Sequence, residues 1–119
     1  MILKELKFNN KIKLSNRISV SPMCQYSAKD GQPTSWHYRH LGNLVLSGAG
    51  LLMLESTAVC KNGRISKKDL CIETKKQTDK FKILVQNLKK TNNIPIGIQL
   101  SHSGRKGSSF IPFSIRDIK

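Results

Sequence analysis

Alternating apolar and polar residues at the start of the chain predict a small β-hairpin. The segments 6–8 and 12–14 both alternate in this way, and a turn-forming Asn-Asn pair lies between them. A β-branched run at 18–20 predicts the next strand. We expect that strand to end before Pro22, because proline fixes φ and has no backbone N–H to donate to a sheet.

Two longer segments have the apolar spacing of a helix. After a polar loop that turns at an Asp-Gly pair, Thr34 is placed to cap a helix that begins at Ser35 and ends near Gly48. The apolar positions expected on its buried face are Trp36, Leu41, Leu44 and Val45. A second helix is predicted over 75–91. Its apolar residues recur at i, i+3, i+4 and i+7 and are Phe81, Leu84, Val85 and Leu88.

Two apolar runs predict strands inside a sheet. The continuous run 51–54 is typical of a strand buried on both faces of a parallel sheet, and the polar residues 55–57 are expected to end it. Residues 96–100 predict a further buried strand. Between these runs, Asn62-Gly63 predicts a tight turn.

The predicted order is hairpin, strand, helix, strand, helix, strand. Strands that alternate with crossover helices form a parallel sheet with right-handed connections, so the fold class is α/β. Functional sites in such sheets form outside the carboxyl ends of the strands. Unusual residues follow three of the predicted strands here, at 21–26, 55–57 and 99–105. We therefore expect these three segments to converge on one site.

The composition suits one modest domain, since the chain has 119 residues. Its formal net charge is +14, from 21 Lys and Arg against 7 Asp and Glu, which admits a basic nucleic-acid-binding module as an alternative function. The lysines are scattered as singles and pairs, however, and few aromatic residues lie among them. A solvated basic surface is the simpler interpretation, and nucleic acid is an unfavoured partner.

The three cysteines, Cys24, Cys60 and Cys71, show no C-x-x-C spacing. This pattern indicates neither a disulfide framework nor a zinc site. The first ten residues are polar, and no apolar run approaches the length of a membrane span. We expect a cytoplasmic protein that has no contact with a membrane.

Three residues at the strand ends are candidates for chemistry. Cys24 is a candidate nucleophile, although no neighbour in the sequence marks it as activated. Gln99 offers both a donor and an acceptor, which suits the imide-like edge of a heterocycle. Glu55 is either a functional carboxylate or a core carboxylate paired with Arg64 or Arg105.

The three histidines are interpreted as structural. His37 and His40 lie at i and i+3 with no third metal ligand near them, and His102 follows the last predicted strand. The sequence also contains neither a G-x-x-x-x-G-K-[ST] phosphate loop nor a G-x-G-x-x-G after a strand.

Four segments resemble, in order and spacing, the N-terminal part of Old Yellow Enzyme family flavoproteins. They are 21–26 (SPMCQY), 55–59 (ESTAV), 63–65 (GRI) and 99–106 (QLSHSGRK). The resemblance extends from about residue 3 to about residue 112. It is strongest to the bacterial branch that carries a cysteine beside the flavin, whose members are called NADPH dehydrogenases or NADH:flavin oxidoreductases.

This resemblance implies a TIM (β/α)₈ barrel that binds FMN noncovalently at the carboxyl ends of its strands. Such an oxidoreductase takes hydride from NAD(P)H onto the flavin and then reduces the activated C=C bond of an α,β-unsaturated carbonyl compound. The resemblance therefore implies FMN as the cofactor, NAD(P)H as the hydride donor and a small enone as the substrate. A homo-oligomer or a complementing chain are further partners to be considered.

The resemblance also implies roles for individual residues after the first barrel strand. Ser21, Pro22 and Met23 would contact the isoalloxazine ring. Cys24 would lie near the N5–O4 side of the flavin and tune its potential. Tyr26 would face the substrate pocket. Cys24 and Tyr26 are thus the two residues expected to act in catalysis.

The next two strands would contribute fewer groups. Ser56, where the family often has Ala, would touch the flavin edge through its backbone. Gln99 would hydrogen-bond the pyrimidine edge of the ring. Arg105 would support the loop after the third strand.

The chain differs from the family in length. A (β/α)₈ barrel needs about 250 residues, so residues 1–119 are expected to be the N-terminal part of such a domain. The family's substrate-binding histidine pair, its arginine near flavin N1 and its phosphate-binding loops would then lie beyond residue 119, and His37 and His40 are not that pair. The tail 113–119 diverges from the family. A frameshift, a premature stop or a gene-fragment boundary is our hypothesis, and a full-length transcript that reads through would contradict it.

Two further interpretations follow from the shortness of the chain. As an isolated fragment it would keep some ring contacts but bind FMN weakly and be inactive. Alternatively, it would be a half-barrel subunit that completes its sheet with a partner chain, and co-purification with a larger flavin-binding chain would reveal this.

Overall fold

The hairpin predicted at the start of the chain is present. The computed structural model describes residues 1–8 and 11–107. Strand β1 (Leu6–Lys7) pairs antiparallel with β2 (Lys13–Leu14), with Leu6 opposite Leu14. The Asn-Asn turn of this hairpin and the tail 113–119 lie outside the described residues.

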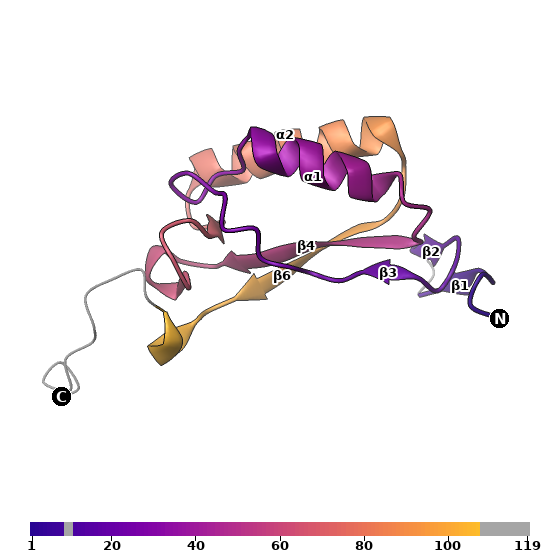
Figure 1. The fold of residues 1–119 in the computed structure, drawn as a ribbon, viewed down its shortest axis with the longest axis horizontal. Helices are drawn as coiled ribbons and strands as arrows, with labels where there is room; N and C mark the ends of the chain where they lie inside the picture. Colours follow the sequence, from indigo (N-terminus) through magenta and orange to yellow (C-terminus); the bar gives the residue numbers. More distant parts are fainter. Residues whose placement is uncertain (9–10, 108–119) are drawn as a thin grey trace, which may run out of the picture.

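A parallel sheet lies beneath two helices that run side by side over one of its faces (Figure 1). The helices are α1 (Ser35–Val45) and α2 (Lys75–Thr91). The strands are β3 (Ser19–Val20), β4 (Leu51–Ala58), β5 (Leu70–Cys71) and β6 (Ile96–Ser101). β4 is central: β6 pairs along one edge of it, while β3 and β5 pair in parallel with its start and its end. The predicted α/β class and parallel sheet are confirmed.

Both helices begin where the sequence predicts, because each has a local cap. Gln77 Oε1 accepts the backbone N–H of Thr74 at 3.0 Å, and Thr74 Oγ1 accepts that of Gln77 at 3.3 Å, a reciprocal capping box at the start of α2. At the start of α1, the backbone N–H of Thr34 donates to His37 Nδ1 at 3.0 Å. The predicted loop turn is also present, with Asp30 and Gly31 both at positive φ.

The core lies between the helices and one face of β4. Its members are apolar side chains from all three elements and include Leu41, Val45, Leu52, Leu54, Phe81, Leu84 and Leu88. Full burial of a leucine side chain contributes about 1.5–3 kcal/mol. The helical stripe of α2 is confirmed, since Phe81, Leu84 and Leu88 are buried and Val85 packs against them.

The prediction that β4 and β6 are buried on both faces is wrong for the described residues. Leu52 and Leu54 are buried, but Leu51 and Met53, which alternate with them, are only half-buried. In β6, Leu100 is 59% exposed. The helices cover one face of the sheet, and none of the described elements covers the other (Figure 1).

The prediction that Trp36 lies on the buried face of its helix is wrong, since the residue is 44% exposed. Its indole N–H donates to Gln25 Oε1 at 3.1 Å. The buried positions of α1 are instead His37, Leu41 and Val45. In the first turn of α1, the buried residue is therefore His37 rather than Trp36.

The polar residues 55–57 do not end β4, which continues to Ala58. The pairing with β6 shifts between Leu54 and Ser56, so Glu55 occupies a bulge. The predicted turn at Asn62-Gly63 is part of a short 3₁₀ helix, Lys61–Gly63. The following loop leads into β5, which the sequence did not predict.

Candidate functional site

β4 and β6 end side by side, whereas β3 ends opposite Leu52 near the start of β4, and the segment that follows β3 brings Cys24 to Ser56. Ser56 is the register partner of Gln99, and the backbone N–H of Ser56 donates to the Cys24 thiol. The structure therefore brings Cys24, Ser56 and Gln99, which come from three separate strand ends, into one neighbourhood.

Cys24 and Tyr26 interact directly, and both hold their protons more tightly than usual. Burial raises the pKa of the Cys24 thiol, and the nearby carboxylates of Asp69 and Glu55 raise it further. The pKa of Tyr26 is raised chiefly by the charge of the Cys24 sulfur. A nucleophilic cysteine needs a lowered pKa. The raised pKa keeps the thiol neutral at pH 7, so it does not favour the nucleophilic role considered from the sequence.

Tyr26 has a backbone conformation that is rare for a residue with a side chain. Its φ is +49°, in the left-handed region, and its side chain is 47% exposed. Such conformations persist where the surrounding structure holds them, and they cluster at functional sites. Because Tyr26 is exposed, its ring is accessible to a small molecule at this edge of the sheet.

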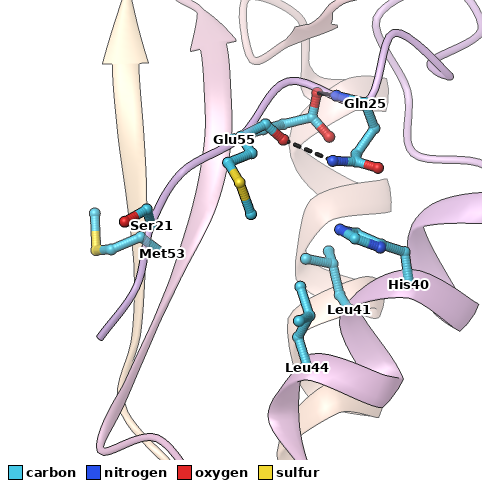
Figure 2. Close-up of a pocket in the computed structure, with 8 residues that line it drawn as sticks. Ser21, Gln25, His40, Leu41, Leu44, Met53 and Glu55 are labelled. Atoms are coloured by element: carbon cyan, nitrogen blue, oxygen red, sulfur yellow. Dashed lines mark hydrogen bonds between the residues drawn. The ribbon is translucent and has the colours of Figure 1, made fainter. Parts of the chain in front are cut away.

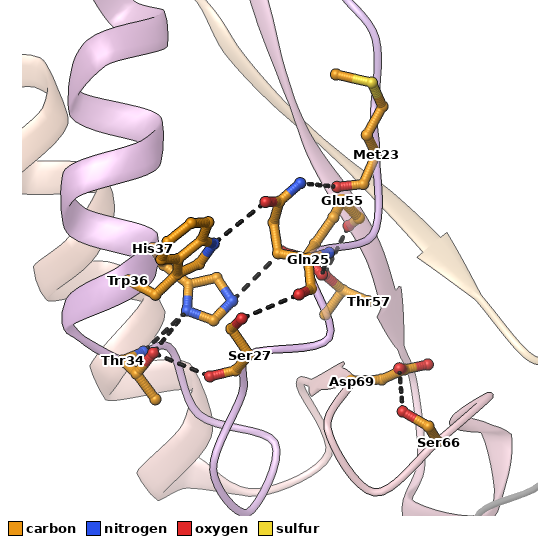
Figure 3. Close-up of polar contacts among 10 residues, drawn as sticks. All are labelled: Met23, Gln25, Ser27, Thr34, Trp36, His37, Glu55, Thr57, Ser66 and Asp69. Atoms are coloured by element: carbon orange, nitrogen blue, oxygen red, sulfur yellow. Dashed lines mark hydrogen bonds and ion pairs between the residues drawn. The ribbon is translucent and has the colours of Figure 1, made fainter.

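Gln25, between these two residues, makes four hydrogen bonds (Figure 3). Its backbone N–H donates to Glu55 Oε2 at 2.9 Å, and its backbone carbonyl accepts from Ser27 Oγ at 2.9 Å. Its side-chain amide donates to the Met23 carbonyl at 2.9 Å and accepts from Trp36. The loop after β3 is thus fixed at its centre.

Glu55 pairs with His37, and the predicted pairing with Arg64 or Arg105 is wrong. His37 Nε2 lies 3.3 Å from Glu55 Oε1, and the two side chains are 0% and 4% exposed. Arg64 donates instead to the carbonyls of Lys61 and Lys67, and Arg105 is exposed. The bulge in β4 explains the error, because it turns Glu55 toward α1.

A shallow pocket lies between this loop and α1 (Figure 2). Its lining residues are Ser21, Met23, Gln25, His40, Leu41, Leu44, Met53 and Glu55. Its volume is about 10 Å³, room for about one water molecule. An organic cofactor would therefore have to lie on the open surface of the strand ends rather than in this pocket.

The residues of that open surface are mostly uncharged. Ser21, Met23, Tyr26 and Gln99 are exposed, and Pro22 and Cys24 are half-buried. Gln99 is exposed, and its side-chain amide makes no hydrogen bond to any of the described residues. The Ser56 hydroxyl donates to Ser101 Oγ at 2.6 Å, and the Ser56 backbone interacts with Cys24.

Two residues of this neighbourhood were not predicted. Asp69, which is 3% exposed, accepts from the Ile65 N–H and the Ser66 hydroxyl and acts electrostatically on Cys24 and Tyr26. Ser101 orients the Ser56 side chain. Ser101 lies in the segment 99–105, which the sequence predicts to reach the site. The position of Asp69 near Cys24 depends instead on the loop before β5.

The other histidines have structural environments, as expected. The ring of His40 stacks on Trp36, with centroids 6.0 Å apart. His102 packs against Gly63, where an added Cβ would come within 2.8 Å of its ring. Within residues 1–8 and 11–107, no group of three acidic, histidine or cysteine side chains is arranged to hold a metal ion, and no helix is long and apolar enough to cross a membrane.

The fold and the position of the site define a class: these are the first three barrel strands of a TIM barrel and the two helices that connect them, with the candidate site at the carboxyl ends of the strands. The family model described as "NADH:flavin oxidoreductase / NADH oxidase family" matches residues 2–110. The chain belongs to this family.

Relatives and solved structures agree with that assignment. The chain is 44% identical over 98 residues to an NADH:flavin oxidoreductase of Gibberella zeae, covering 82% of this chain and 24% of the relative. It is 40% identical over 113 residues to an NADPH dehydrogenase of Geobacillus sp., covering 87% and 33%. It is also similar to the old yellow enzyme from Trypanosoma cruzi, with a TM-score of 0.78, 26% identity, and 89% and 28% covered. The chain thus spans about a quarter to a third of these relatives.

Proposed function

We propose that the chain is part of an FMN-dependent NAD(P)H oxidoreductase of the Old Yellow Enzyme type, which reduces the C=C bond of α,β-unsaturated carbonyl compounds. The part described here would form one wall of the flavin site. One observation carries the proposal: Cys24, Ser56 and Gln99 meet at the carboxyl end of the parallel sheet and present an open, uncharged surface.

The chemistry of that surface suits a flat, redox-active ring. Thioether and thiol groups are soft and polarisable, and they contact aromatic faces favourably. The Cys24 thiol is neutral, so it would influence the electronics of a flavin as a hydrogen-bonding group without adding a charge. When bound, FMN would accept hydride from NAD(P)H and pass it to the enone.

Each residue then has a proposed role. Ser21, Pro22 and Met23 would support the ring, and Cys24 would tune it. Tyr26 would face the substrate, because its ring is exposed beside Cys24.

Residues of the other two strands would contact the pyrimidine edge of the flavin ring. Gln99 has a side-chain amide that is unpaired among the described residues, and it would bond the ring's imide-like edge. Ser56 would contact the ring through its backbone.

We also propose that these 119 residues alone bind FMN weakly and are inactive. The sequence has no phosphate-binding loop of either common type, so only ring contacts are supplied. The uncovered sheet face would pack against the remainder of a barrel, from the same chain or a complementing one.

A chimeric protein tests the function. The part of the Geobacillus NADPH dehydrogenase that aligns with this chain is replaced by this chain's residues. We expect the chimera to bind FMN and to oxidise NADPH when 2-cyclohexenone is added, at a rate comparable to the unaltered enzyme assayed beside it. A folded chimera that lacks this activity would contradict the proposal.

A further inference from the structure

Glu55 occupies a position that the proposed ring contacts do not explain. It is a carboxylate in the middle of a parallel strand and is 4% exposed, which is costly unless both oxygens are paired. Oε2 accepts the Gln25 N–H at 2.9 Å, and Oε1 lies 3.3 Å from His37 Nε2, a close contact without the geometry of a hydrogen bond. The carboxylate is therefore committed to holding the loop after β3.

The orientation of His37 is fixed from its other side. Since the Thr34 N–H donates to His37 Nδ1, that nitrogen must be unprotonated, and the ring proton lies on Nε2, toward Glu55. Thr34 Oγ1 donates to the Ser27 carbonyl at 2.9 Å, and Ser27 Oγ donates to the Gln25 carbonyl. The contacts form a closed ring that starts and ends at Gln25 (Figure 3).

This ring of contacts holds the peptide groups on both sides of Gln25. Cys24 precedes it and Tyr26 follows it in the chain, and Tyr26 has the left-handed φ of +49°. A tyrosine keeps such a conformation only where its neighbours are constrained. The direction in which the Cys24 thiol and the Tyr26 ring leave the loop therefore depends on how Gln25 is held.

We propose that Glu55, oriented by His37, is a positioning residue that holds the Gln25 backbone and so sets where the Cys24 thiol and the Tyr26 ring lie. Its relevance to catalysis rests on the proposed function, whereas its hold on the loop does not. The buried carboxylate acts through Gln25 and need not touch a cofactor or a substrate.

The test is amide hydrogen exchange of the purified chain followed residue by residue by NMR. Glu55→Met keeps the approximate volume but removes both acceptors. Loss of a hydrogen bond to a charged group is expected to speed exchange of the Gln25 amide by about tenfold or more. The matched control is Thr57→Val, which removes a buried hydroxyl that donates to the Glu55 backbone carbonyl but leaves the Glu55 carboxylate and its bond to Gln25 in place. It should leave the Gln25 amide within about twofold of wild type.

A purely structural role would change the exchange of core amides such as that of Leu54, whereas the positioning role changes Gln25 while Leu54 stays protected. An unchanged Gln25 amide in folded Glu55→Met overturns the proposal. A flavin-free chimera would instead count against the proposed function alone.

If Glu55→Met does not fold, a pair of variants at His37 decides. His37→Leu removes the polar ring that contacts Glu55 Oε1 and should speed Gln25 exchange several-fold, whereas His37→Gln keeps a polar N–H group there and should restore protection. Equal exchange in the two variants overturns the proposal.

Discussion

Asn16 is predicted to be the residue whose loss most weakens the start of the sheet. Its side chain is 9% exposed and lies between the segment that enters β3 and the segment that enters β4. Nδ2 donates to the Gly48 carbonyl at 2.8 Å, and Oδ1 accepts from the N–H groups of Ile18 and Gly50, each at 3.0 Å. One amide therefore links the beginnings of two neighbouring strands.

The expected loss in Asn16→Ala follows from these contacts. The Gly50 N–H also donates to the Ile18 carbonyl at 2.9 Å, so it keeps a partner. The Gly48 carbonyl and the Ile18 N–H lose the side chain that pairs with them. At about 1 kcal/mol for each lost bond, with more for a buried group left unpaired, the free energy of unfolding should fall by about 2–3 kcal/mol.

Urea unfolding followed by circular dichroism measures this loss. With an m-value of about 1.5 kcal/mol/M, the midpoint should fall by roughly 1–2 M. The control is Asn87→Ala on the exposed side of α2, which should change stability by less than about 0.5 kcal/mol. If Asn16→Ala is as stable as this control, the side chain does not link the strands as described.

Two other predictions concern the thiol and the core. In a Cys60→Ala, Cys71→Ala background, the pH midpoint of Cys24 alkylation by iodoacetamide should lie above the ordinary value of 9.0, because burial, Asp69 and Glu55 disfavour the thiolate. Asp69→Asn should lower that midpoint. The stability that the neutral thiol contributes should be lost as pH rises through the raised pKa. A midpoint at or below 9.0 in the background that keeps Asp69 would refute the raised pKa of Cys24. Leu84→Ala should lose about 2–5 kcal/mol in urea unfolding, whereas Ile83→Ala, at a position 46% exposed, should lose far less, and equal losses would contradict the described core.

The helices were predictable from sequence because their determinants are local. α2 has the predicted bounds, since Thr74 and Gln77 cap it and its apolar stripe is regular. α1 also begins as predicted, but Trp36 was assigned to the wrong face. Its indole N–H is satisfied by Gln25, a residue whose position depends on the loop after β3.

The errors arose where non-local contacts decide the structure. β5 has two residues, too few for a pattern. The partner of Glu55 was missed because a bulge turns the carboxylate toward His37. The convergence of the three strand ends, by contrast, follows from parallel topology, which the alternation of strands and helices already indicates.

The flavin content of the chimera shows whether these strand ends form part of a flavin site. The absorbance spectrum is recorded after desalting, with Gln99→Leu in the same chimera as the matched variant. We expect about one FMN to be retained per folded chimera, and weaker retention in Gln99→Leu because the ring's imide-like edge loses its partner. A chimera that melts like the unaltered Geobacillus enzyme but emerges colourless, or that holds FMN equally well with Gln99→Leu, would contradict the proposal that these strand ends form a wall of the flavin site.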